Sequence, residues 1–170
     1  MAWTTPKTDW VLGELATQSH LNDIGNNLAA LKDPPSDNYE LDEGSDYSTS
    51  STTFVDVDGT NLALTINTNG GDVLVHFHGM IGKAAASHYW YFDVEVDGTR
   101  IGGDDGIIGQ LESTNSRDPV SFTRLITGLA AGSHTFKLQW KVNANSITLY
   151  AGAGTTNSDL HPQFWAREIS

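Results

Sequence analysis

The chain has 170 residues, of which 38% are hydrophobic and 9% aromatic, enough for one domain with a real core. It contains no cysteine, which excludes disulfides, thiolate nucleophiles and cysteine-based zinc sites. Nine Lys and Arg against 21 Asp and Glu give a net charge of −12, so nucleic acid is not an expected partner, because binding to a phosphate backbone needs clustered cations.

The N-terminal stretch MAWTTPKTDW is polar and lacks the apolar segment of a signal peptide. No later run is apolar enough to cross a membrane. We therefore expect a chain that is made in the cytoplasm and does not insert into membranes. Pro6 and Gly13, together with Trp3 and Trp10, predict an irregular arm rather than a helix over residues 1–16.

A helix is predicted next, with Thr17 as its N-cap and Lys32 near its end, because Pro34 and Pro35 forbid continuation. Four apolar residues recur in it at steps of three, four and three: Leu21, Ile24, Leu28 and Leu31. This is a narrow seam, and a helix this short and weakly amphipathic needs a partner. The partner is either its own domain or further copies of itself in a short bundle.

Residues 36–51 are acidic, rich in Ser and poor in apolar residues, and Pro34 and Pro35 precede them. They are therefore predicted to form a linker, either a mobile spacer or a strap that lies along the surface. The predicted organisation is an arm and oligomerisation helix over 1–35, this linker, and a head over 52–170.

Residues 52–170 are predicted to form strands connected by turns. The stretch from Gly132 to Val142 alternates cleanly, with Phe136, Leu138, Trp140 and Val142 on one face. Further strands are predicted over 72–78, 119–126, 146–151 and 163–169, and runs hinged at Asp58-Gly59 and Asp97-Gly98 predict hairpins. Strands at short spacing with no helix between them indicate a mainly β fold, an antiparallel sandwich or barrel.

His76 and His78 lie on one side of a predicted strand, and the run from Gly70 to His78 resembles the opening of the cupin metal-binding motif. The glutamate that should follow is missing, so no metal and no cofactor are predicted. The preferred interpretation is that both histidines lie at a subunit interface, where acidification would bring like charges together.

Trp90 and Phe92 are expected in the core, whereas Tyr89 and Tyr91 share the outer face with Asp93 and Glu95. The two tyrosines are predicted to contact another subunit or, alternatively, to stack on a sugar ring. The two carboxylates are predicted to solubilise the sheet. Asp-Gly stretches at 56–61 and 102–106 are interpreted as turns rather than calcium loops.

The sequence carries no nucleophile elbow, nucleotide-binding loop or convincing catalytic carboxylate pair, so no catalytic residue and no enzymatic activity are predicted.

The N-terminal run resembles a leader found in structural proteins of tailed bacteriophages and prophages. The matching positions are Trp3, Thr4, Pro6, Trp10, Gly13, Glu14, Leu21, Asn22, Leu28, Leu31 and Lys32. The C-terminal stretches GLAAGSHTFKLQWKV, ITLYAG and HPQFWAREI look like the jelly-roll region of the same kinds of protein, which often trimerise like tumour-necrosis-factor heads.

The resemblance implies a homotrimeric virion protein, either a capsid decoration or head fibre or a tail fibre component, that attaches to other virion proteins through its arm. Trp3 and Trp10 and the helical seam are then the anchoring and oligomerisation residues. The alternative is a carbohydrate- or receptor-binding module for host adsorption, which would present Tyr89 and Tyr91 or the glycine-rich loop over 102–109 to a cell-surface glycan.

Overall fold

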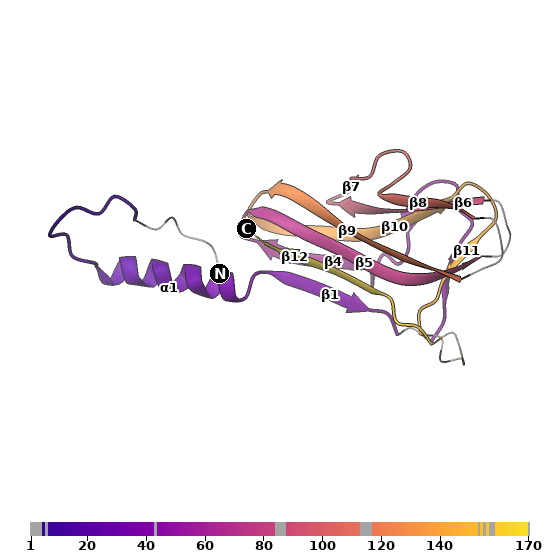
Figure 1. Cartoon of the computed structure of the whole chain (residues 1–170), viewed down its shortest axis with the longest axis horizontal. Coiled ribbons are helices and arrows are strands. Elements are labelled where there is room, and N and C mark those ends of the chain that lie inside the picture. Colours follow the sequence, from indigo (N-terminus) through magenta and orange to yellow (C-terminus); the bar gives the residue numbers. More distant parts are fainter. Residues whose placement is uncertain are drawn as a thin grey trace.

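The structure is a computed structural model that describes residues 5, 7–42, 44–83, 88–112, 117–152, 154, 156 and 159–169 (Figure 1). The elements are α1 Gln18–Lys32, β1 Ser36–Glu40, β2 Tyr47–Thr49, β3 Val55–Asp56, β4 Ala63–Thr68, β5 Gly71–Lys83, β6 His88–Val96, β7 Thr99–Arg100, β8 Ile108–Glu112, β9 Arg117–Leu129, β10 Gly132–Val142, β11 Ile147–Leu149 and β12 Gln163–Glu168.

The strands form two antiparallel sheets that pack face to face as a jelly-roll sandwich, which confirms the predicted fold class. In the first sheet the order is β1-β12-β5-β11-β2, and β9 pairs with the other edge of β5. In the second sheet the order is β3-β10-β6-β7, with β4 on β10 and β8 on β6. The long strands β5 and β10 organise the two layers because each pairs with three neighbours.

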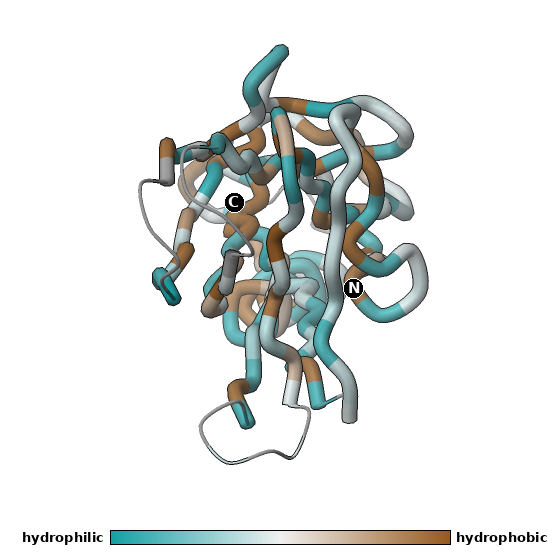
Figure 2. Tube along the Cα trace, turned by 90° about the vertical axis from the view of Figure 1, so that its right-hand side faces the viewer, coloured by the Kyte–Doolittle hydropathy of each residue, from teal (hydrophilic) through white to brown (hydrophobic). Residues whose placement is uncertain are grey.

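The core lies between the sheets, and hydrophobic and hydrophilic residues alternate along the strands (Figure 2). In β10 the side chains of Phe136, Leu138, Trp140 and Val142 are at most 2% exposed, as the alternation predicts. Aromatic rings from both sheets meet there: Phe77, Trp90, Phe92, Phe122, Phe136, Trp140 and Phe164. Burial of each such side chain contributes about 1.5–3 kcal/mol, so this layer holds the sheets together.

The hairpin predicted at Asp97-Gly98 is confirmed. Both residues have positive φ, 49° and 84°, as a type I′ turn requires, and Val96 pairs with Thr99. The hairpin predicted at Asp58-Gly59 is wrong, because β3 and β4 both pair with β10 and not with each other. Asp58 instead caps a turn, since its Oδ1 accepts hydrogen bonds from the backbone N–H groups of Thr60 and Asn61.

His134, at the start of β10, binds the hairpin at Asp97-Gly98 through its imidazole ring. Its Nδ1 lies 2.6 Å from Asp97 Oδ2 and its Nε2 lies 2.9 Å from the carbonyl oxygen of Ala130. Because a carboxylate and a carbonyl only accept, both ring nitrogens donate, which requires the charged imidazolium. The hydrogen bond to Asp97 accordingly raises the pKa of His134 above its usual 6.5.

We expect His134→Gln to lower the free energy of unfolding by about 1–2 kcal/mol at pH 6. The folded-state pKa is raised, so the stabilisation is fully present below pH 6.5 and is lost as the pH rises through the folded-state value. Urea denaturation of both proteins between about pH 5.5 and 9 measures this difference. A deficit that stays constant over this range would show that charge on His134 contributes nothing.

The prediction of a linker over residues 36–51 is wrong. β1 pairs with β12 at five positions and β2 pairs with β11 at three, so both strands belong to the first sheet. Leu41, between them, is 0% exposed. Edge strands are held mainly by backbone hydrogen bonds and need few apolar residues, so their composition resembles that of a spacer. The sandwich therefore begins at Ser36.

Helix α1 extends away from the end of the sandwich where β1 begins (Figure 1). It starts where predicted, because Thr17 Oγ1 accepts from the backbone N–H of His20 while His20 Nδ1 accepts from that of Thr17. Within the described residues, no helix has the length and apolar character needed to cross a bilayer.

Candidate functional site

The apolar seam of α1 is exposed to solvent in the single chain. Leu21 is 59% exposed, Ile24 46%, Leu28 62% and Leu31 66%. The helix therefore does not pack its seam on its own domain, which was one of the two predicted arrangements. The four seam side chains lie on one surface of α1, and this surface is exposed and can contact another molecule.

The arm before α1 adds further exposed apolar side chains. Trp10 packs edge-on against His20, with ring centroids 5.0 Å apart, and its Nε1 donates to the carbonyl oxygen of Lys7. Val11, Leu12 and Leu15 are between 68% and 106% exposed. The arm is thus a folded turn that presents apolar residues. Trp3, the other tryptophan predicted to anchor the chain, lies outside the described residues.

The outer face of the first sheet carries both predicted histidines. We call this surface, formed by Leu74, His76, His78, Leu125 and Trp165, the histidine face. The registers place these residues in adjacent rows of β5, β9 and β12. The ring of His76 stacks on Trp165 at 5.2 Å and lies 5.7 Å from that of His78.

The surroundings of His76 favour its neutral form. Its Nδ1 lies 2.8 Å from the hydroxyl oxygen of Thr123, and it is partly covered by Trp165. Burial lowers the pKa of His76 below its usual value, and the neighbouring His78 lowers it further. A second chain packed on this face would strengthen both effects.

A groove of about 860 Å³ joins the end of the α1 seam to the histidine face. Its apolar lining comes from Ala30, Leu31, Pro34, Leu74, Trp165 and Ile169. Asn69, Arg167 and Glu168 also line the groove. The groove connects the seam to the histidine face, although the two come from segments far apart in the sequence.

In the part of the chain that the structure describes, no third side chain joins the two histidines in a group that could hold a metal ion. Among the described residues, the only group of His, Cys, Asp and Glu side chains with ligand atoms close enough for one ion is Asp42, Asp159 and His161, within 4.8 Å of one another. All three are exposed, and exposed groups of this kind occur without a metal. The glutamate that the cupin motif requires is also absent from the sequence.

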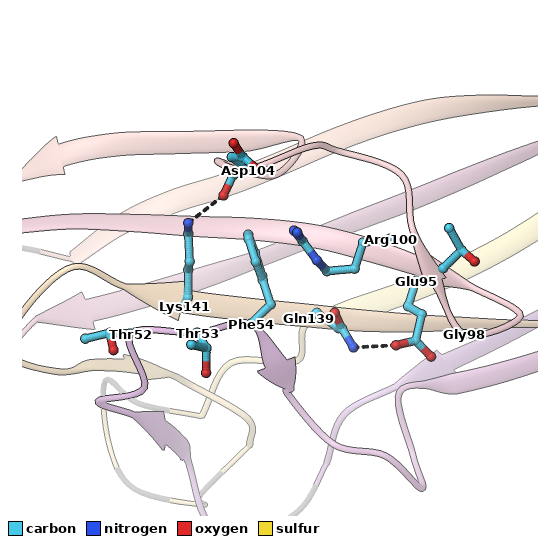
Figure 3. Close-up of a pocket in the computed structure, with 10 residues that line it drawn as sticks. Thr52, Thr53, Phe54, Glu95, Gly98, Arg100, Asp104, Gln139 and Lys141 are labelled. Atoms are coloured by element: carbon cyan, nitrogen blue, oxygen red, sulfur yellow. Dashed lines mark hydrogen bonds between the residues drawn. The ribbon is translucent and has the colours of Figure 1, made fainter.

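A second feature lies on the outer face of the second sheet, where a pocket of about 710 Å³ opens beside Phe54 (Figure 3). We call it the β10 pocket. The Phe54 ring stands between two cations, with Arg100 Cζ 4.2 Å and Lys141 Nζ 4.9 Å from its centroid. Thr52, Thr53 and Thr99 line the pocket, together with Glu95, Gly98, Asp104 and Gln139.

The predicted tyrosines border this pocket. Tyr89 is 40% exposed, and its ring stacks on that of Tyr91 with centroids 6.1 Å apart. Lys141 Nζ lies 4.8 Å from the Tyr91 centroid and so bridges Tyr91 and Phe54. The tyrosine pair therefore meets the β10 pocket through Lys141, which lines the pocket and contacts Tyr91.

The prediction that Asp93 and Glu95 both solubilise the sheet is wrong for Asp93, which is 0% exposed. Its Oδ2 accepts from Arg100 at 2.9 Å and its Oδ1 accepts from the backbone N–H of Val94. Burial raises the pKa of Asp93, and these hydrogen bonds oppose the rise. A Cβ at Gly102 would also collide with the backbone of Gly106, so the glycine-rich loop packs tightly over this pair.

Sequence reasoning did not find Phe54, Arg100 or Gln139. They come from three separate segments and share no motif. The alternation of β10 puts Gln139 on its solvent face, yet the side chain is only 6% exposed and is hydrogen-bonded to Asp56 and Glu95.

The sequence matches no protein family and no curated protein. Solved structures with a similar fold include the globular domain of zebrafish complement 1qA protein, at 14% identity and a TM-score of 0.47, over 81% of this chain and 98% of that one. Another is the PRD1 vertex protein P5, at 9% identity and a TM-score of 0.46, over 80% and 97%. A third is Eiger TNF from S. frugiperda, at 11% identity and a TM-score of 0.44, over 80% and 94%. Likenesses this distant carry no argument about function.

Proposed function

We propose that the protein is a non-enzymatic structural module that assembles with copies of itself through the α1 seam and the histidine face. The observation that carries this proposal is the exposure of Leu21, Ile24, Leu28 and Leu31, each between 46% and 66%, on a helix that extends from the sandwich. A helix of this length is marginal alone in water, and burial of each leucine against another chain contributes about 1.5–3 kcal/mol.

A homotrimer is the proposed assembly, with three seams and three histidine faces arranged around one axis. The resemblance of the leader to virion proteins of tailed bacteriophages and prophages supports a place in a virion, as capsid decoration, head fibre or tail fibre component. In this arrangement the arm with Trp10, Val11 and Leu12 attaches to another virion protein, and the sandwich projects outward.

Sedimentation equilibrium of the full chain tests the proposal. We expect a trimeric mass for the natural chain and a monomeric mass for the double variant Leu21→Glu/Leu28→Glu, because two buried charges per helix cannot be accommodated in the seam. The matched control is Asn22→Glu/Ala29→Glu, which adds the same charge at the same spacing outside the seam and keeps the trimer. A natural chain that stays monomeric at high concentration, or a seam variant of unchanged mass, would contradict the proposal.

Acidification is expected to weaken the assembly. Burial and His78 already lower the pKa of His76 in the single chain, and a second chain on this face would bury the ring further. Protonation of His76 as the pH falls below 6.5 therefore opposes association. His78 shares its row of the face with Glu40, and Arg167 lies one row to the other side of His76. We expect association to weaken about tenfold or more between roughly pH 8 and pH 5. In His76→Gln/His78→Gln this dependence should disappear, and a dependence that persists would assign it to other groups.

A further inference from the structure

We propose that the β10 pocket binds a neutral, hydroxyl-rich ligand, a carbohydrate ring, on the face of the sandwich opposite the self-association surface. This inference goes beyond the structural role and does not depend on the oligomeric state. It rests on one buried side chain without a hydrogen-bond partner and on the way in which the charges around it are already paired.

The side-chain amide of Gln139 has one fixed orientation. Its Nε2 donates to Asp56 Oδ1 and to Glu95 Oε2, each at 2.8 Å (Figure 3 shows the bond to Glu95). Carboxylates only accept, so the amide cannot be flipped. Gln139 Oε1 is consequently the free end of the amide, and it has no hydrogen-bond partner although it is buried. A buried acceptor left unpaired is unfavourable, and a donor on a ligand removes this cost.

The cations that line the pocket are already engaged. Arg100 Nη1 donates to Asp93 Oδ2 and, at 2.8 Å, to the carbonyl oxygen of Gly103. Lys141 Nζ donates to the carbonyl oxygen of Asp104 and lies 3.5 Å from Asp105 Oδ1. An anionic ligand would have to break these contacts, and its charge would be repelled by Glu95 and Asp104.

A cationic ligand is disfavoured too, because Arg100 and Lys141 stand on either side of Phe54 in the middle of the pocket (Figure 3). A neutral polyol avoids both penalties. Its hydroxyls donate to Glu95 and, once the Phe54 ring turns aside while Arg100 keeps its bonds, to Gln139 Oε1, and they exchange hydrogen bonds with the threonine hydroxyls of the rim. Sugar hydroxyls both donate and accept, so one ring satisfies all of these groups.

The size and surroundings of the pocket fit this class of ligand. A volume of about 710 Å³ lies within the roughly 300–1,000 Å³ of typical small-molecule sites. Beyond Lys141, the stacked pair of Tyr89 and Tyr91 offers an exposed aromatic surface on which a further ring packs. The chemistry therefore favours a short oligosaccharide that starts in the pocket and extends over the tyrosines.

Saturation-transfer NMR on the full chain tests this inference. The probes are neutral sugars, namely glucose, galactose, mannose, fucose and N-acetylglucosamine, with glucuronate and glucosamine as charged counterparts. We expect transfer to at least one neutral sugar and stronger transfer to it than to either charged sugar. Silence across the neutral sugars, or stronger transfer to a charged one, would overturn the proposal.

Two variants with matched controls locate the site. Thr53→Trp fills the mouth of the pocket and leaves the buried amide untouched, whereas Thr60→Trp adds the same side chain at an exposed turn elsewhere. Glu95→Gln removes an acceptor from the pocket, whereas Glu40→Gln makes the same change on the other sheet. We expect at least a tenfold loss of affinity in each pocket variant and none in its control. Thermal melts verify folding, and unchanged affinity in a folded Thr53→Trp would exclude this site.

Discussion

Replacement of Arg100 with methionine is expected to destabilise the sandwich by about 3–5 kcal/mol at neutral pH, because it leaves the Asp93 carboxylate buried without its counter-charge. Asp93 is 0% exposed, and its Oδ2 lies 2.9 Å from Arg100 Nη1. The backbone N–H groups of Val94 and Gly102 still donate to the carboxylate, but two neutral donors do not fully offset the desolvation of a charge. The loss is large for a domain whose total stability is about 5–15 kcal/mol.

Urea denaturation of the natural chain and Arg100→Met, monitored by tryptophan fluorescence, measures this loss. The double variant Asp93→Asn/Arg100→Met serves as the control, because a neutral amide is cheaper to bury, and it should recover at least half of the lost stability. Arg124→Met, at an exposed position of β9, should change stability by less than about 0.5 kcal/mol.

The pH dependence of Arg100→Met has a definite sign. Burial raises the pKa of Asp93, and removal of Arg100 raises it further. A carboxyl whose folded-state pKa is raised destabilises the fold above that pKa and ceases to do so as the pH falls toward 3.8. The deficit of the variant should therefore shrink on acidification. A deficit independent of pH would mean that Arg100 contributes through its contact with Phe54 and not through its charge.

The contrast between Asp93 and β10 shows what the sequence predicts well. Alternation in β10 places Phe136, Leu138 and Trp140 in the core because period two follows directly from strand geometry. The same rule puts Asp93 on the outer face of β6, and the register confirms that position beside Gln139. The rule does not predict that Phe54 and Arg100, which come from other segments, pack over this face and bury Asp93.

The same distinction separates the two candidate sites. The α1 seam lies within one helix, so its spacing in the sequence suffices to define it. The β10 pocket is assembled from loops and strands between residues 52 and 141, and its decisive feature, the unpaired Oε1 of Gln139, depends on bonds to Asp56 and Glu95 that no local pattern encodes.

A chain that begins at Thr52 is expected not to form a stable sandwich, whereas a chain that begins at Asp33 should fold. The shorter chain lacks β1 and β2, which pair with β12 and β11, and so exposes the backbone of two strands. It also lacks Leu41, whose backbone N–H donates to the carbonyl oxygen of Pro162 and whose side chain is 0% exposed. Near-UV circular dichroism and cooperative urea unfolding distinguish the two chains.

The point variant Leu41→Ala in the full chain measures the stability that the Leu41 side chain contributes, separately from that of the strands β1 and β2. Truncation of a fully buried leucine costs about 2–5 kcal/mol, so we expect a lower urea midpoint with an unchanged slope. Leu12→Ala, at a fully exposed position of the arm, should leave the midpoint unchanged. If the chain from Thr52 unfolds cooperatively at the midpoint of the full chain and Leu41→Ala has no effect, residues 36–51 are a dispensable strap on the sandwich. The losses that we expect would instead show that this polar segment, with β1 and β2, is part of the fold. The spacer between α1 and the sandwich is then the short stretch from Asp33 to Pro35.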